Sequence, residues 1–243
     1  MDYLLKKFLP RIEFDSYEDF KANYTVNVPE NFNFGFDVVD AWAEEEPEKK
    51  ALVWCDEEDN EKIFTFTDIK RLSNKAANFF KSLGVKKGSV VMLILRRRWE
   101  YWVCATALHK LGAILIPGTL QLTKKDIVYR GNAAQVCAVV CVNDPFVIEQ
   151  VEAAQPDIPS LQNKILVAEQ REGWLDLNEE LEKFPDTFAP PARRPPAGTT
   201  LCWCTSPLAP RACPRWCSTT SPTPWGTLSP PSTGSRWRRT SCT

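Results

Sequence analysis

The sequence of 243 residues predicts an α/β protein, a layered and largely parallel sheet with flanking helices. The first observation is a set of short, continuous apolar runs rich in β-branched residues, at 90–95, 113–116 and 136–142, which is typical of strands buried on both faces. The second is that segments with apolar residues every three or four positions separate these runs, as crossover helices do. Strands and helices that alternate in this way favour one parallel sheet with helices on both faces.

Each further element follows from the same two patterns and from the residues that begin and end it. The segment 67–83 has one apolar face, with Thr67 as the expected N-cap and Gly84 closing the C-terminus. Gly112 is expected to end the next helix. The other predicted helices cover 37–43, 98–111, 123–134 and 145–154, and the other predicted strands cover 51–55, 63–66 and 164–167.

The average composition is that of a globular protein, but it changes sharply near residue 190. Hydrophobic residues at 44% and charged residues at 25% exclude a collagen-like or wholly disordered chain. No apolar run approaches the ~20 residues of a membrane span, and the N-terminus does not resemble a signal peptide, so we expect a cytoplasmic protein. All 31 acidic residues lie at or before Asp186, whereas residues 191–243 contain seven arginines and ten of the 19 prolines.

This change divides the chain into three parts. Residues 1–31 are an N-terminal extension, polar with scattered aromatic side chains, where we expect a short helix and a loop packed on the main body. Residues 32–188 carry the α/β pattern. Residues 189–243 contain no Val, Ile or Phe, so they cannot build a core and are expected to be disordered.

The single histidine and the cysteines before the tail offer little chemistry. His109 lies near the end of a predicted helix. A catalytic imidazole is one hypothesis, and a partly packed cation near a helix C-terminus is the favoured one. The cysteines are expected to be small core residues, and two that lie four positions apart on one strand are expected to share a face. These four cysteines are Cys55, Cys104, Cys137 and Cys141, of which the last two form the pair.

Polar groups follow two of the predicted strands at their carboxyl ends, where open parallel sheets bind ligands. Three consecutive arginines, 96–98, could meet phosphates or a carboxylate, and a solvated charge run is the alternative. Gly118 would let a ligand approach the backbone and Thr119 offers a hydroxyl, with a plain turn as the alternative. Neither a G-x-G-x-x-G motif nor a Walker-type lysine loop occurs before the tail.

The order of several short motifs resembles the AMP-forming acyl-CoA synthetases, especially their medium-chain branch. Residues 107–119 are A-L-H-K-L-G-A-I-L-I-P-G-T, and D-I-V-Y-R follows at 126–130. An entry helix at 34–43 and K-G-S-V-V at 87–91 precede them in the family's order. The resemblance covers 32–188. It implies an enzyme that joins a carboxylic acid to AMP with Mg-ATP and then transfers the acyl group to the thiol of coenzyme A.

The resemblance also implies ligands and their places. ATP, Mg²⁺ and coenzyme A are the family's cofactors and a small carboxylic acid is its substrate, with no nucleic acid among its partners. The turn at Gly118 and Thr119 and the region of Arg130 lie on the side that faces coenzyme A. The family's phosphate-gripping loop, rich in Ser, Thr and Gly, is expected shortly after residue 190 and is not written there. No catalytic residue and no metal ligand is therefore assigned.

The tail predicts a shifted reading frame. When the last base of each codon is joined to the first two bases of the next, Trp203-Cys204 forces valine. The codons from there through Arg215 permit V-Y-F-T-S-G-T-T-G-M-P-K, the pattern of the missing loop. We therefore predict a frameshift between about residues 188 and 199 followed by an early stop, which leaves an inactive N-terminal fragment of a ligase.

The composition of the tail leaves two other functions open. Four thiolates would bind zinc, although the first pair is closer in sequence than is usual. These are Cys202, Cys204, Cys213 and Cys217. Arginines and tryptophans together would suit nucleic acid through charge and stacking. The alternative to a ligase fragment is a non-enzymatic α/β fragment that binds a partner or misfolds. The acid itself is open among acetate, branched short-chain, medium-chain and aryl acids.

Overall fold

The computed structural model describes residues 2–189, and a five-stranded parallel sheet forms their centre. The strands run in the order β4-β3-β5-β6-β7, which places β4 and β7 at the two edges. Their bounds are β3 (Val90–Ile94), β4 (Ile114–Pro117), β5 (Val136–Val142), β6 (Asn163–Val167) and β7 (Leu175–Asp176). Strand β3 pairs in parallel with both β4 and β5, so the predicted α/β fold with these three neighbours is confirmed.

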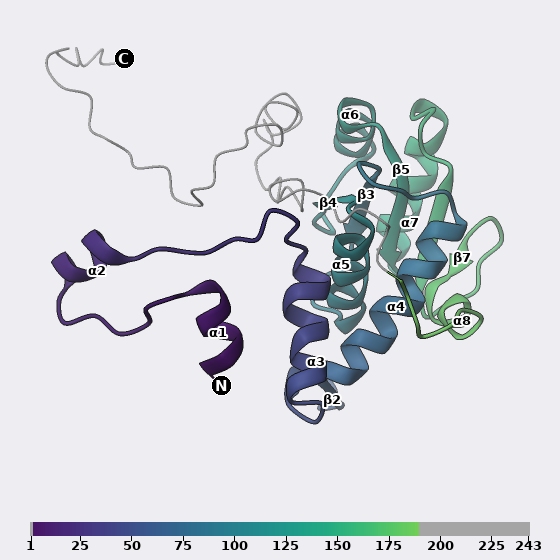
Figure 1. The fold of residues 1–243 in the computed structure, drawn as a ribbon. Coiled ribbons are helices and arrows are strands. Elements are labelled where there is room, and N and C mark those ends of the chain that lie inside the picture. Colours follow the sequence, from purple (N-terminus) through teal and green to yellow (C-terminus); the bar gives the residue numbers. More distant parts are fainter. Residues whose placement is uncertain (1, 190–243) are drawn as a thin grey trace, which may run out of the picture.

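Helices cover both faces of this sheet (Figure 1). The α-helices of the described part are α1 (Asp2–Phe8), α2 (Tyr17–Asn23), α3 (Ala41–Glu45), α4 (Phe66–Ser82), α5 (Trp99–Leu111), α6 (Lys124–Ala134), α7 (Pro145–Ala154) and α8 (Leu177–Glu182). A π-helical turn η1 (Gly35–Asp40) leads into α3, and a 3-10 turn η2 (Gln155–Asp157) follows α7. Strands β1 (Lys50–Cys55) and β2 (Glu61–Thr65), which correspond to the strands predicted at 51–55 and 63–66, form a separate antiparallel hairpin.

Strand β3 supplies two separate cores by alternation. Val91 and Leu93 pack with α4, α5 and α8 in the first core, whereas Met92 and Ile94 pack with α6 and α7 in the second. Every residue of β3 is buried. Because each face of the strand has its own helices, the molecule has three layers, which explains why this stretch of sequence is continuously apolar.

Helix α4 begins earlier than predicted and is capped by a different threonine. The Thr65 hydroxyl accepts from the Asp68 N–H at 3.2 Å, and the Asp68 carboxylate accepts from the Thr65 N–H at 2.9 Å. Thr67, the predicted N-cap, instead donates its hydroxyl to the Pro47 carbonyl. The prediction is wrong because only Thr65 has an acidic residue three positions later, which completes a capping box. The helix closes as expected, with Gly84 in the left-handed region at φ 82°.

A bulge breaks the alternation at the start of β5. Val90 pairs with Val136 and Val91 with Ala138, so Cys137 is an extra residue in the ladder. Cys137 therefore packs against the first core while Cys141 lies in the second. The prediction that these two cysteines share a face is wrong, since an even spacing keeps one face only in an unbroken strand.

The predicted helix 37–43 begins two residues early, with η1. Asn33, which is fully buried, accepts from the Gly35 N–H at 3.0 Å and donates to the His109 carbonyl at 2.7 Å. A Cβ at Gly35 would lie 2.6 Å from Lys110 Cγ. This close approach to α5 requires glycine, and it fixes where the segment enters the body.

Residues 2–31, here called the N-terminal arm, stand beside the layered body (Figure 1). Helix α1 connects the arm to η1 through Lys7, whose ammonium lies 3.8 Å from the Asp37 carboxylate. Helix α2 buries no side chain. The arm thus contains two short helices rather than the single one predicted, and α1 makes the contact.

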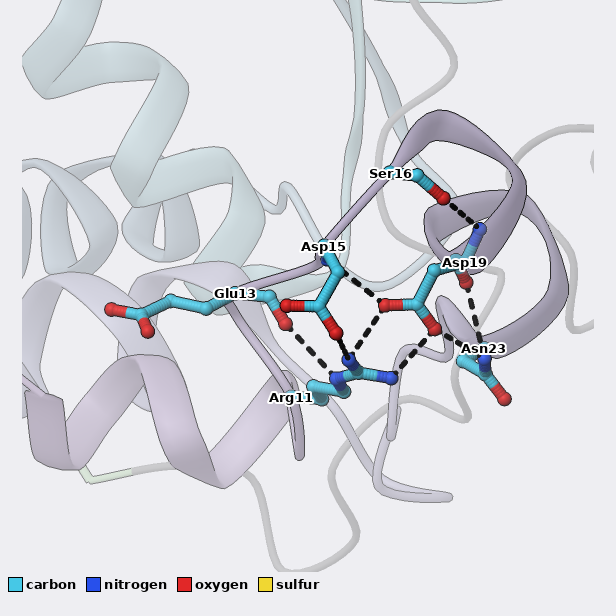
Figure 2. A network of polar contacts seen from close by, with 6 residues as sticks. All are labelled: Arg11, Glu13, Asp15, Ser16, Asp19 and Asn23. Atoms are coloured by element: carbon cyan, nitrogen blue, oxygen red, sulfur yellow. Dashed lines mark hydrogen bonds and ion pairs between the residues drawn. The ribbon is translucent and has the colours of Figure 1, made fainter.

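The arm has a polar network of its own (Figure 2). Arg11 donates to both oxygens of the Asp19 carboxylate, at 2.8 and 2.6 Å, and Ser16 caps α2 by accepting from the Asp19 N–H. The hydrogen bond from the Asp15 N–H lowers the pKa of Asp19 most, and the hydrogen bonds from Arg11 and Asn23 and the Arg11 charge lower it further. A two-oxygen contact of this kind orders the loop before α2.

The predictions made for the tail, namely disorder, the shifted frame and the zinc or nucleic-acid contacts, fall on residues 190–243, which lie outside the described residues. Between residues 2 and 189, no helix combines the length and the apolar character that crossing a membrane requires.

Candidate site at the carboxyl ends of β3 and β4

The carboxyl ends of β3 and β4 bring together the two turns predicted to face a ligand. Leu93 of β3 pairs with Pro117 of β4, and the Gly118 N–H donates to the Leu93 carbonyl at 2.7 Å. The arginine turn begins two residues after Ile94. Since parallel strands end at the same edge of a sheet, the arginine turn and the Gly118 turn are neighbours. We call this region the strand-end site.

Two of the three arginines at this site form ion pairs, an exposed one at Arg96 and a partly buried one at Arg98. Arg96 pairs with Glu57 at 2.8 Å, and its φ of 44° is unusual for a residue with a side chain. Arg98 donates to both oxygens of Glu100, at 3.1 and 2.8 Å, and Glu100 is fully buried. Burial of that carboxylate requires such a partner.

Arg97 is the remaining guanidinium. It is exposed, and within the described residues it makes no ion pair. Its main chain is fixed, because Trp54 Nε1 of the hairpin donates to the Arg97 carbonyl at 2.8 Å. Of the three arginines, Arg97 is therefore the one whose guanidinium has no ion-pair partner among residues 2–189, and its main chain is held in place by the hairpin.

Gly118 is required by packing. A Cβ there would lie 2.8 Å from Ile94 Cγ1 and 3.0 Å from Leu122 Cδ1, so apolar side chains already fill the space. Thr119 is exposed, and its carbonyl accepts from the Leu122 N–H at 3.4 Å. This geometry explains the turn by itself, and contact with coenzyme A stays a prediction for both residues.

Arg130 lies on α6, partly buried, away from the turn in sequence. Hydrogen bonds from Thr123 lower the pKa of Asp126, and the Arg130 charge contributes to the same shift. Gly118 and Thr119 are consecutive residues of one turn, and the described part of the chain shows no hydrogen bond or ion pair from Arg130 to either.

His109 is neutral at pH 7. It packs edge-on against Phe34 at 5.2 Å between ring centroids, and burial lowers its pKa to about 4. Its Nδ1 has no hydrogen-bond partner in the described part of the chain. The favoured prediction of a cation is wrong, because loss of hydration outweighs the attraction of a helix C-terminus.

The reactivity of the cysteine thiols depends on how deeply each side chain is buried. Cys104 and Cys141 are core residues, as predicted, and burial raises the pKa of both thiols. A thiol held in its neutral form is a poor nucleophile. Cys55 is exposed at the end of β1, which contradicts its predicted place in the core. The hairpin leaves part of its surface in solvent, so position in a strand does not guarantee burial.

A buried polar network escaped the sequence analysis. Lys110 of α5 is 0% exposed, and its ammonium donates to Asp40 at 2.7 Å and to Asn74 at 2.6 Å. The only signal in the sequence is a lysine in a helix rich in apolar residues. Its partners lie 70 and 36 positions away, so no local pattern could have named them.

These features define a three-layer α/β domain with a candidate ligand edge at the strand ends, and comparison with known proteins gives its family. The family model described as "AMP-binding enzyme" matches residues 39–206, more than half of the chain. The chain therefore belongs to the AMP-binding enzyme family, and the resemblance to acyl-CoA synthetases is confirmed.

Curated relatives agree with this assignment. The chain is 34% identical over 181 residues to the mitochondrial acyl-coenzyme A synthetase ACSM3 of Homo sapiens. The aligned region covers 72% of this chain and 30% of that protein. It is 37% identical over 161 residues to the mitochondrial ACSM5 of Rattus norvegicus, covering 63% and 28%. The chain thus spans about 30% of the length of these relatives.

A solved structure supports the fold. The crystal structure of the anthranilate CoA ligase AuaEII in complex with anthranoyl-AMP matches with a TM-score of 0.58 at 20% identity. The match covers 69% of this chain and 31% of that one. At this identity the likeness concerns the arrangement of helices and strands alone.

Proposed function

We propose that this chain is the N-terminal portion of an AMP-forming acid–CoA ligase and that, as written, it does not complete adenylation. The parent reaction converts a carboxylic acid, ATP and coenzyme A into acyl-CoA, AMP and pyrophosphate. The ordered match of residues 39–206 to the AMP-binding family is the observation that carries this proposal. The frameshift predicted from the sequence between about residues 188 and 199 supports its second half.

The described residues fit part of the ligand set. Arg97 supplies a free guanidinium and Thr119 a hydroxyl at the strand-end site, groups that suit the phosphates of coenzyme A. No residue is assigned to Mg-ATP: residues 2–189 contain no group of three or more acidic, His or Cys side chains placed to hold a metal ion, and Mg²⁺ bound with a nucleotide commonly needs only one or two carboxylates beside the phosphates. We derive no chemical step through these cofactors from residues 2–189.

The test is acid-dependent release of pyrophosphate in the presence of ATP and Mg²⁺. We expect none from the purified 243-residue protein, because positioning of the phosphates is the main contribution of a protein to such chemistry. A frame-restored chain assayed beside it should turn over. Comparable turnover by the 243-residue protein would place the active site before residue 190, and failure of both would contradict the ligase proposal.

A non-enzymatic α/β fragment is the competing hypothesis. The nucleotide sequence around codons 185–200 separates the two, because a compensating base there restores the enzyme and its absence leaves the fragment. The compartment is a further proposal: the sequence predicts the cytoplasm, whereas the names of the ACSM relatives specify mitochondria. Cell fractionation with an antibody against the arm decides between them.

A further inference from the structure

Residues 184–188 cross helix α4 after the last strand, and two asparagines of α4 hold their main chain. Asn74 and Asn78 lie one helical turn apart and therefore on one side of the helix. Their amide nitrogens donate to the carbonyl oxygens of Pro185, Asp186 and Thr187, at 3.0, 2.8 and 2.9 Å. We call the two asparagines the amide clamp. It grips three consecutive peptide groups irrespective of their side chains.

Lys110 fixes the orientation of one half of this clamp. Its ammonium donates to the Asn74 Oδ1 at 2.6 Å and has no acceptor capacity of its own. Asn74 must therefore turn its oxygen toward Lys110, which leaves its NH₂ group facing the Asp186 carbonyl. Lys110 is fully buried, so water does not compete for this contact.

Asp40 is the second partner of Lys110, and the buried charge pair raises the question of what it contributes beyond stability. The Lys110 ammonium lies 2.7 Å from the Asp40 carboxylate, and 5.7 Å from the centre of the Phe36 ring. Removing either charge alone leaves the other buried and unpaired, which is strongly destabilising. A well-packed apolar pair often gives equal stability, so stability alone does not call for these charges. What the pair adds is a fixed direction for the Asn74 amide.

Two phenylalanines hold the same segment by packing. Phe184 lies 5.9 Å from Phe79, and Phe188 lies parallel to Phe36 at 6.4 Å between ring centroids. These contacts position side chains, whereas the amide clamp positions the peptide groups between them. An experiment must therefore separate the polar contribution from the apolar one.

We propose that Lys110 is a positioning residue: acting through Asn74, it keeps the amide clamp closed on residues 185–187 and so fixes where the chain leaves the α/β body. The importance of this fixed exit for catalysis rests on the proposed function, in which the intact enzyme has its phosphate-gripping loop a few residues after the clamped segment 185–187. A shift of that exit would move the loop relative to the strand-end site.

The test measures chymotrypsin cleavage of the Phe188–Ala189 bond in the 243-residue protein by mass spectrometry. Cleavage after Phe188 requires residues 185–189 to leave the clamp. Asn78→Ala removes two hydrogen bonds and is expected to raise the rate about tenfold. Asn74→Leu keeps a side chain of similar size without adding a charge but loses the donor, so an increase of about fivefold is expected. A purely steric role for Asn74 predicts no change.

Lys110 itself is tested in the charge-free double variant Lys110→Met with Asp40→Asn, which strands no buried charge. We expect cleavage after Phe188 to rise about fivefold, because Asn74 is then free to turn. Lys75→Ala is the matched control: Lys75 lies on the same helix and pairs with a side chain, Glu182, at 2.8 Å, so its loss should leave the rate unchanged.

Two reference bonds in the same chain separate local release from unfolding. Cleavage after Tyr17, which is 70% exposed in the arm, reports protease activity, and cleavage after fully buried Phe80 reports global opening. Asn78→Ala touches neither buried charge and keeps the test decisive if the double variant unfolds. Wild-type rates after Phe188 in both Asn78→Ala and Asn74→Leu would overturn the clamp.

A second experiment separates this inference from the proposed function. In the frame-restored chain, Asn78→Ala is expected to raise the KM for ATP severalfold and to leave the KM for the acid unchanged. If Asn78→Ala raises the rate of cleavage after Phe188 but leaves the KM for ATP unchanged, the clamp exists but positions nothing for the reaction. If the restored chain makes no acyl-AMP at all, the proposed function fails while the cleavage result stands.

Discussion

At the scale of single residues, burial decides which groups carry charge. His109 has no polar partner on Nδ1 within the described residues and a pKa of about 4, while the unfolded chain has the ordinary value of 6.5. Between these two values the unfolded state binds a proton that the folded state does not. The folded state is therefore favoured fully above pH 6.5, and this contribution is lost as the pH falls toward 4.

The corresponding prediction is a loss of up to about 3 kcal/mol in the free energy of unfolding between pH 6.5 and 4. His109→Phe keeps a ring against Phe34 and cannot titrate, so its stability should change far less over this range. Urea titrations of both proteins at half-unit pH steps measure the difference. Burial raises the pKa of Asp40, which acts in the opposite sense in both proteins and cancels in the comparison. Parallel pH profiles would contradict the assignment.

The same scale marks the limit of what the sequence predicts about the candidate site. Gly118 and Thr119 were found because a turn after a buried strand is a local signal. The burial of Glu100, which lies only two positions from its partner Arg98, and the network around Lys110 were missed, because burial of a charge is decided by elements far away in sequence. Arg97 became distinctive only once its two neighbours were seen to be paired.

At the scale of elements, most helices and strands were predictable because apolar periodicity and terminal glycines are local. The start of α4 and the face of Cys137 were not. Two threonines compete for the cap of α4, and the bulge in β5 depends on its register against β3. A strand sequence gives alternation, and only its neighbour shows where alternation is interrupted.

The capping box of α4 gives a prediction at this scale. Thr65→Ala is expected to lower the free energy of unfolding by about 1 kcal/mol, because the N–H of Asp68 loses its acceptor at the helix start. Thr65→Ser keeps the hydroxyl and should stay within about 0.5 kcal/mol of the wild type. Thermal and urea unfolding followed by circular dichroism measure both. An equal loss in the two variants would mean that the Thr65 methyl group, rather than its oxygen, matters.

At the scale of the whole molecule, stability resides in the two cores and not in the N-terminal arm. Around α2 the arm is ordered by contacts among its own residues, which Figure 2 shows for Arg11 and Asp19, and α2 buries no side chain. Helix α1 meets the body through the ion pair of Lys7 with Asp37. The layered body depends instead on side chains such as Leu93, which is fully buried in the first core. Order in the arm and stability of the body are therefore separable.

A pair of substitutions tests this separation. Phe20→Ala in α2 is expected to change the free energy of unfolding of the body by less than about 0.5 kcal/mol, because Phe20 is 40% exposed. Leu93→Ala removes a fully buried side chain and should cost about 2–5 kcal/mol. Urea unfolding of the 243-residue protein gives both values. A comparable loss for Phe20→Ala would show that the arm is part of a core.

The place of β4 in the sheet has a consequence for behaviour in concentrated solution. Along one side β4 pairs with β3, and among residues 2–189 no strand pairs with its other side. The free main-chain groups of an edge strand invite a strand from another molecule. Strand β4 is only four residues long and ends in Pro117, which has no N–H to donate. Self-association through this edge is therefore limited to a short, weak ladder, and it should increase only as the protein is concentrated.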